Sequence, residues 1–274
     1  MIDQPNVIFV VGSSRSGTSA VTRVLSLCGC SLPAHLVRAD RHNVLGYWES
    51  IDVININEEI LHFMDVSCND PAGIDIIRDE HLGNLVALRY TEILAEIIKR
   101  NLSNRPLIVK DPRISLLLRH WLAACELIPA RPVTIMAFRW PDDVATSISE
   151  RDSLDRFSAK RLWLKFTLLA ELQSREYPRS FIAYEKLLAD WRFEMENISA
   201  RLKLKLTFRN TQNVDMFLRE SLRHHSNSQT EGDSFDKTCV DTYNHLVSLN
   251  VLPDVSRKWF DHIFNKYLLT SDKL

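Results

Sequence analysis

The chain has 274 residues, 45% of them hydrophobic, and its 34 basic residues nearly balance 35 acidic ones. A chain of this length can bury a sizeable core and favours one domain over two. The formal net charge of -1 excludes a general nucleic-acid binder, whose affinity would rest on an excess of positive charge. Any recognition of an anion must therefore be local.

The first predicted elements are a strand, a turn and a helix. Asn6 to Val11 is a short apolar, β-branched run that ends in Gly12, and from Thr18 to Leu27 the apolar positions take helical spacing. The elements predicted next are helices over 52–64 and 82–99, a loop over 66–73 between them, and a short buried strand over 107–109.

The second half of the chain repeats the strand-to-helix pattern. A helix is predicted over 114–127 and a strand over 132–138, and Pro141 opens another helix at its favoured first-turn position. The remaining predictions are one or two helices over 153–177, a strand over 180–183, helix over 185–204, a polar stretch over 226–238 and a final helical region. This alternation predicts an α/β fold with a central parallel β-sheet flanked by helices on both faces.

Residues 1–274 are expected to form a single catalytic domain, with helical insertions at about 31–105 and 153–178 and a helical C-terminal region at 234–274. The apolar run from Val7 to Val11 is too short to span a bilayer and lacks the flanks of a secretory signal. We therefore expect a cytoplasmic protein without a transmembrane segment. Five cysteines, with one residue between Cys28 and Cys30, favour reduced structural thiols over a metal site.

The first strand-to-helix turn carries the most specific functional signal. Gly12 and Gly17 have the spacing of a Walker A loop, which lets backbone N–H groups and a helix N-terminus wrap an anion. A nucleotide triphosphatase would continue with Lys and then Ser or Thr, but here Thr18 and Ser19 follow. The cation lies inside the loop as Arg15, which favours anion transfer without a metal. The alternative is a plain connecting turn with a solvated arginine.

The run Arg15-Ser16-Gly17-Thr18-Ser19 resembles the 5'-phosphosulfate loop of the sulfotransferase superfamily, which commonly reads Lys or Arg and then Ser-Gly-Thr-Thr/Ser. These enzymes use 3'-phosphoadenosine 5'-phosphosulfate (PAPS) as the sulfuryl donor. The resemblance implies a P-loop-like fold, transfer to an acceptor hydroxyl or amine, and release of adenosine 3',5'-bisphosphate without a metal. It also implies that Arg15 stabilises the leaving group. The donor-binding residues that it implies in this loop are Ser14, Arg15, Ser16, Gly17, Thr18 and Ser19.

A second anion site is predicted after the third strand. Arg139 ends this strand and Ser147 lies about two turns into the next helix, so both side chains are placed to converge on one phosphate. The segment resembles the 3'-phosphate motif of the same family, in which Ser follows Arg by eight positions. Trp140 departs from the small polar residue expected there, and it either covers the site or packs. Tyr184 resembles the family tyrosine that lies near adenine, with core packing as the alternative.

Two segments are candidates for the acid–base chemistry. Lys110-Asp111-Pro112-Arg113 follows a predicted strand, where open α/β sheets place their ligand sites. It resembles a motif of bacterial and Golgi-type relatives and replaces the Lys-Thr-His of cytosolic animal enzymes, so the histidine base of those enzymes is missing. Gly46-Tyr47-Trp48-Glu49 resembles a bacterial Gly-Tyr-Phe/Trp-Glu segment. Glu49 is the first candidate for the general base and Asp111 the second, and capping or ion pairing is the alternative for both.

Three functions therefore stay open: a PAPS-dependent sulfotransferase, a P-loop kinase or NTPase, and a noncatalytic nucleotide-binding module. The acceptor carries no readable motif, so hydroxyls of carbohydrates, lipids, peptides and natural products are all candidates. Arg223, His224 and His225 are candidates for a late phosphate clamp or a solvated surface, and adjacent histidines point apart on a helix, which disfavours metal binding. The oligomeric state has no signal in the sequence.

Overall fold

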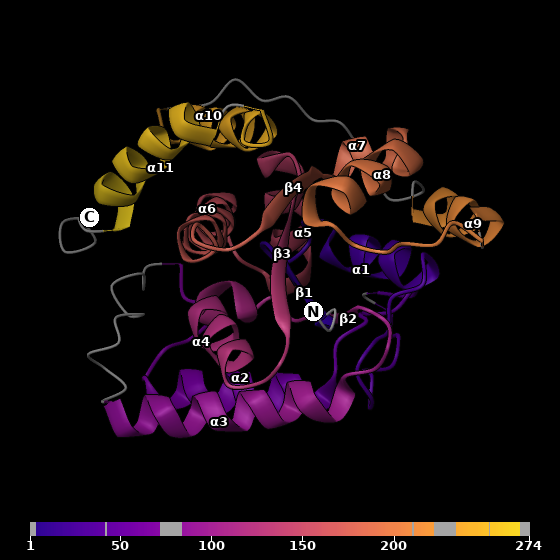
Figure 1. Cartoon of the computed structure of the whole chain (residues 1–274). Helices are drawn as coiled ribbons and strands as arrows, with labels where there is room; N and C mark the ends of the chain where they lie inside the picture. Colours follow the sequence, from indigo (N-terminus) through magenta and orange to yellow (C-terminus); the bar gives the residue numbers. More distant parts are fainter. Residues whose placement is uncertain are drawn as a thin grey trace.

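A computed structural model of the chain describes residues 4–41, 43–71, 84–209, 211–221, 234–251 and 253–268. Its strands β1 (Asn6–Val11), β2 (Leu107–Lys110), β3 (Arg131–Phe138) and β4 (Arg179–Ala183) form one sheet in the order β2-β1-β3-β4. Every neighbouring pair in this sheet is parallel. The predicted α/β fold with a central parallel sheet is confirmed (Figure 1).

Helices connect these strands and cover both faces of the sheet. Within the described ranges they are α1 (Thr18–Leu27), α2 (Ile51–Phe63), α3 (Asn84–Asn101), α4 (Ile114–Glu126), α5 (Pro141–Asp152), α6 (Arg156–Gln173), α7 (Tyr184–Ala189), α8 (Trp191–Leu202), α9 (Thr211–Ser221), α10 (Ser234–Ser248) and α11 (Pro253–Leu268). The sequence pattern predicts most of these bounds within a few residues. It predicts one helix where α7 and α8 are separate, and it gives no prediction for α9. The separation falls at Asp190, whose carboxylate accepts the Phe193 N–H and caps α8.

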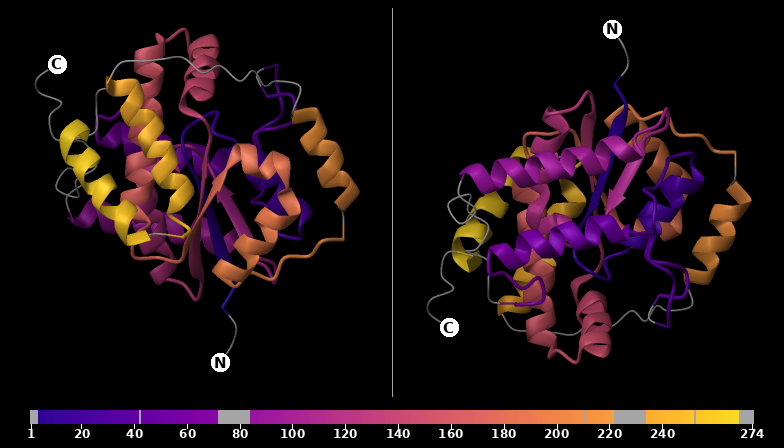
Figure 2. Two further views of the ribbon diagram at one scale, coloured as in Figure 1. Left: turned by 90° about the horizontal axis from the view of Figure 1, so that it is seen from above. Right: turned by 90° about the horizontal axis from the view of Figure 1, so that it is seen from below.

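The two faces of the sheet bury two different apolar clusters. Alternate residues of β1 point to opposite faces, because side chains in a strand alternate. Val7 and Phe9 pack on the face covered by α2 to α6, α10 and α11, and Ile8 and Val10 pack on the face covered by α1, α8 and α9. Figure 2 shows the sheet between these two layers of helices. None of the described helices is long and apolar enough to cross a membrane.

The strand order creates a topological switch point between β1 and β3. The chain leaves β1 toward β2 on one side, and it leaves β3 toward β4 on the other. Open α/β folds bind ligands in the crevice outside the carboxyl ends of two such strands. The glycine-rich turn of residues 12–17 follows β1 and Arg139 follows β3. The fold therefore brings the two predicted anion sites to the same edge of the sheet.

Lys165 of α6 is a fully buried lysine, and we expect it to make the stability of the fold dependent on pH. Its Nζ donates a hydrogen bond to the Asp70 carbonyl at 3.0 Å, and burial lowers the pKa of Lys165 to about 8. An unfolded lysine has a pKa of about 10.4, so between about pH 8 and pH 10 the unfolded chain binds more protons than the folded chain. We expect the free energy of unfolding to rise by roughly 2 kcal/mol across this range.

Lys165→Met should abolish this rise, because methionine fills the same space without a charge. The measurement is urea unfolding of the wild type and the variant at several pH values in that range. Lys99→Met, at an exposed lysine of α3, is the matched control and should keep the wild-type slope. An unchanged slope in Lys165→Met would show that the pH dependence comes from another group.

Candidate active site

A cleft of about 780 Å³ opens at the carboxyl ends of the strands. Its walls come from the turn after β1, the segment before α2, the turn after β2, and from α5, α6, α7 and α9. It brings together residues that the sequence predicts from separate motifs. The predicted site residues that line it are Ser14, Arg15, Gly17, Thr18, Ser19, Glu49, Lys110, Arg139, Ser147 and Tyr184.

The turn of residues 12–17, here called the P-loop, is fixed by close contacts with β3 and α4. A Cβ atom on Gly12 would lie 2.1 Å from the Ala137 carbonyl oxygen, so only glycine fits there. The Ser115 hydroxyl accepts the Gly12 N–H at 2.9 Å and donates to the Gly12 carbonyl at 3.1 Å. One buried side chain thus satisfies both backbone groups at the start of the loop.

Ser115→Ala should lower the free energy of unfolding by about 1–2 kcal/mol, because it leaves a buried N–H and a buried C=O without their partner. The measurement is the denaturant midpoint. Ser174→Ala is the matched control, since the hydroxyl of Ser174 is also buried but serves the C-terminal end of α6, away from the cleft. Only Ser115→Ala should also weaken binding of nucleotides, and equal binding by both variants would contradict the anchoring role.

The second half of the P-loop packs against α7. Gly17 has φ of 87°, and a Cβ on it would lie 2.5 Å from Cδ2 of Tyr184. Tyr184 both belongs to the apolar cluster of this face and lines the cleft. Ser16 is buried and does not line the cleft, and its N–H donates to the Ser13 carbonyl at 3.2 Å. Ser16 therefore holds the shape of the turn. The other five loop residues predicted to bind the donor line the cleft.

The two predicted anion sites meet in the cleft. Arg15 Nε donates to Ser147 Oγ at 2.7 Å, which joins the P-loop to α5. Arg139 donates to the Asp143 carboxylate at 3.1 Å, and its guanidinium lies 5.5 Å from the centre of the Tyr184 ring. Burial lowers the pKa of Arg15, and the charges of Arg151 and Arg139 lower it further. Cations gathered in a partly buried cleft are typical of an anion-binding site.

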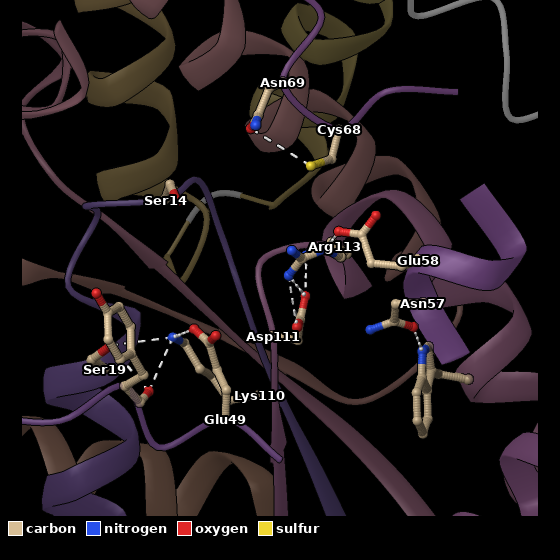
Figure 3. Close-up of polar contacts among 12 residues, drawn as sticks. Ser14, Ser19, Glu49, Asn57, Glu58, Cys68, Asn69, Lys110, Asp111 and Arg113 are labelled. Atoms are coloured by element: carbon tan, nitrogen blue, oxygen red, sulfur yellow. Dashed lines mark hydrogen bonds and ion pairs between the residues drawn. The ribbon is translucent and has the colours of Figure 1, made fainter. Parts of the chain in front are cut away.

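Glu49 and Lys110 form a buried ion pair at the wall of the cleft. Their side chains are 11% and 3% exposed. Lys110 Nζ donates to the Glu49 carboxylate and also to Ser19 Oγ and the Tyr47 carbonyl, each at 3.2 Å (Figure 3). Lys110 thereby joins the end of β2, the first turn of α1 and the segment before α2. The carboxylate of Glu49 is held at the cleft by this network.

Asp111 is buried and does not line the cleft. Its side chain is 0% exposed and accepts the Arg113 N–H at 2.7 Å and Arg113 Nη1 at 3.0 Å, while Arg113 also pairs with Glu58 (Figure 3). Burial raises the pKa of Asp111, and the charge of Arg113 opposes this shift. The geometry matches the capping and ion-pairing alternative for Asp111, and it leaves Glu49 as the candidate base that faces the cleft.

Trp140 packs and does not line the cleft. Its backbone N–H donates to the Glu185 carboxylate at 2.9 Å, and its ring lies edge-on to Tyr243 of α10 with centroids 5.1 Å apart. The Tyr243 hydroxyl donates to the other oxygen of Glu185 at 3.0 Å. These contacts hold the turn that carries Arg139 against α7 and α10. Arg223, His224 and His225 lie outside the described residues.

The cleft also has lining residues outside the predicted set, and two of them are Arg151 and Phe217. Arg151 of α5 lies one helical turn after Ser147, a spacing that puts both side chains on one face of a helix. Phe217 of α9 also lines the cleft. The helical spacing from Ser147 is a signal that identifies Arg151 from sequence alone. Phe217 has no comparable signal, because the pattern does not predict its helix.

The chain is an α/β protein with a parallel sheet, a P-loop that lacks the Walker lysine, and a cleft in which arginines gather at the switch point. No protein-family model and no curated protein sequence matches the chain. Among solved structures, it is similar to the sulfotransferase domain of the Synechococcus olefin synthase, with a TM-score of 0.51 and 19% identity over 88% of this chain and 96% of that chain. The chain therefore has the sulfotransferase fold, as the P-loop resemblance implies.

Two other solved structures align less closely. The sulfotransferase domain of the curacin biosynthetic pathway gives a TM-score of 0.42 and 15% identity, covering 85% of this chain and 82% of that chain. Sulfotransferase STF1 from Mycobacterium tuberculosis gives a TM-score of 0.46 and 14% identity, covering 78% and 71%.

Proposed function

We propose that the chain is a PAPS-dependent sulfotransferase that transfers the sulfuryl group to an acceptor hydroxyl or amine. One observation carries this proposal: the cleft joins the P-loop, with Arg15, to Arg139 and Ser147 at the switch point of the sheet. A nucleotide with phosphates on both its 3' and 5' positions needs two such cationic centres in one cleft. The cleft volume of about 780 Å³ is also in the usual range for small-molecule sites.

Each part of the donor has a set of cleft residues that suits it. The P-loop N–H groups, Arg15 and the hydroxyls of Thr18 and Ser19 suit the 5'-phosphosulfate, because oxyanions bind well to backbone amides at a helix N-terminus. Arg139 and Ser147 suit the 3'-phosphate. The aromatic residues Tyr184 and Phe217 line the same cleft and suit the adenine ring, which prefers aromatic neighbours.

In the proposed reaction Glu49 is the general base. The acceptor oxygen forms a bond to sulfur while its proton passes to the Glu49 carboxylate. The bond between sulfur and the 5'-phosphate oxygen breaks, and its electron pair stays on that phosphate, which leaves as adenosine 3',5'-bisphosphate. Arg15 stabilises the charge that develops there, and Lys110 keeps Glu49 at the cleft wall. Asp111 is a positioning residue: it accepts hydrogen bonds from Arg113 and so holds Arg113 at the cleft wall.

Two alternatives are less well supported. A P-loop kinase or NTPase places a lysine directly after the second glycine, and this chain has Thr18 at that position. A noncatalytic nucleotide-binding module would need no base facing the cleft, whereas Glu49 lines it. The acceptor class stays open among hydroxyls of carbohydrates, lipids, peptides and natural products.

The proposed reaction is tested with PAPS that carries radioactive sulfur, incubated with the protein and a chelator in the presence of a panel of hydroxyl acceptors. We expect the label to leave the nucleotide and adenosine 3',5'-bisphosphate to accumulate. Binding of the nucleotide with no release of label for any acceptor or for water would favour the noncatalytic module. Transfer of the terminal phosphate of ATP in the presence of Mg²⁺ would favour the kinase.

A further inference from the structure

Arg151 lines the cleft together with Arg15 and Arg139, and the two predicted anion sites leave it without a role. It lies near the C-terminal end of α5, one helical turn beyond Ser147, and its side chain is 27% exposed. Its Nη1 donates to the Ser14 hydroxyl of the P-loop at 3.3 Å, across 137 positions of sequence. Arg151 therefore joins α5 to the P-loop.

The guanidinium of Arg151 is held in one orientation by its neighbour in the chain. Asp152 accepts hydrogen bonds from Nε at 2.7 Å and from Nη2 at 2.6 Å. This bidentate contact occupies one edge of the planar fork, and the Nη1 edge faces Ser14 and the cleft. An arginine fixed in this way loses little conformational freedom when it binds an oxyanion.

Arg151 contacts the P-loop and lines the same cleft as the proposed base. The hydrogen bond that Arg151 donates to Asp152 raises the pKa of Arg151, and the charges of Asp152, Tyr47 and Glu49 add to this effect. After burial, the charge of Arg151 is the largest influence that lowers the pKa of Arg15. Its contact with Ser14, the neighbour of Arg15 in the chain, puts Arg151 beside the P-loop, and Arg151 shares the cleft with Glu49. Arg15 and Glu49 are the two residues that flank the bond-breaking and bond-making oxygens in the proposed reaction.

We propose that Arg151 binds the oxygens of the sulfuryl group itself as it moves from the donor to the acceptor. This role rests on the proposed function, in which the sulfuryl group moves from the leaving phosphate at Arg15 to the acceptor at Glu49. The guanidinium donates hydrogen bonds to sulfate oxygens as it does to phosphate oxygens. Adenosine 3',5'-bisphosphate lacks the sulfuryl group, so its binding does not involve Arg151. Arg139, in contrast, contacts a phosphate that both nucleotides carry.

The test compares the dissociation constants of PAPS and adenosine 3',5'-bisphosphate by calorimetry for the wild type and for Arg151→Ala, Arg151→Lys and Arg139→Ala. Arg151→Ala should weaken the binding of PAPS by about tenfold and change the affinity for the bisphosphate by less than about twofold. The affinity of Arg151→Lys for PAPS should lie between those of Arg151→Ala and the wild type. Arg139→Ala should weaken both nucleotides by the same factor. Arg192→Ala, at an exposed ion pair with Asp215, is the matched control and should change neither.

An equal loss of affinity for both nucleotides in Arg151→Ala would overturn the proposal. Arg151 would then only support the P-loop through its hydrogen bond to Ser14. Unchanged affinity for both would remove any role in donor binding. Arg151→Lys keeps the charge and provides the same comparison if the alanine variant does not fold. A wild-type protein that binds neither nucleotide would overturn the proposed function itself, a result distinct from the selective loss of PAPS.

Discussion

Glu49→Gln is expected to lower the rate of sulfuryl transfer by about 10²- to 10⁴-fold, the range that a general base contributes. Glutamine keeps an oxygen that accepts the hydrogen bond from Lys110, but it cannot take the acceptor proton at neutral pH. The affinity for adenosine 3',5'-bisphosphate should change by less than about threefold, since the base acts only on the acceptor. The measurement is release of radioactive sulfur from PAPS, alongside calorimetric binding of the bisphosphate.

Asp111→Asn is the matched control for this prediction. Asp111 is buried beside Glu49 and Lys110 but does not line the cleft, so its amide variant should lower stability more than turnover. If Glu49→Gln turns over at the wild-type rate, the proton goes to another group and Glu49 serves only the ion pair. If Asp111→Asn is the slower enzyme at equal stability, Asp111 is the base after all.

Arg139→Ala is expected to weaken binding of adenosine 3',5'-bisphosphate by about 100-fold, because two charge-assisted hydrogen bonds to the 3'-phosphate account for about 3 kcal/mol. Adenosine 5'-phosphosulfate lacks that phosphate, and its affinity should stay within about twofold of the wild-type value. Arg15→Ala should weaken both ligands, since both carry the 5' group that the P-loop holds. Calorimetry with the two ligands and the two variants makes a complete comparison.

The pattern across the two ligands decides the assignment. If Arg139→Ala loses affinity for both ligands, Arg139 maintains the shape of the cleft through its contacts with Asp143 and Tyr184 and does not bind the 3'-phosphate specifically. Unchanged affinity in both arginine variants would remove the site assignment. The melting temperature of each variant, measured without ligand, separates a change in binding from a change in folding.

Local patterns predict much of this fold because the strands are short and apolar, and because a glycine or a proline follows each of the first three within three residues. The P-loop and Arg139 follow neighbouring parallel strands, so the prediction that they form one site requires only the order of the strands. Tyr184 lies in the same cleft because β4 pairs with β3. In these cases the order of the strands brings motifs that are far apart in the sequence close together in space.

Contacts between distant segments could not be predicted in this way. Glu49 and Lys110 are 61 positions apart and Gly12 and Ser115 are 103 apart, and no spacing rule links either pair. The burial of Asp111 and the packing of Trp140 against Tyr243 also depend on which helices cover the sheet. The separation of α7 from α8 follows from a single capping aspartate within an otherwise helical pattern.

The most direct test of a site for two phosphates on one nucleotide is the melting temperature of the protein with adenosine 3',5'-bisphosphate and with ATP, each with and without Mg²⁺. A ligand that binds only the folded state stabilises it, by about 2.7 kcal/mol at 100 times its dissociation constant. The predicted result is a rise with the bisphosphate that does not depend on Mg²⁺. A rise with ATP alone that requires Mg²⁺ would contradict the account and favour a kinase or NTPase.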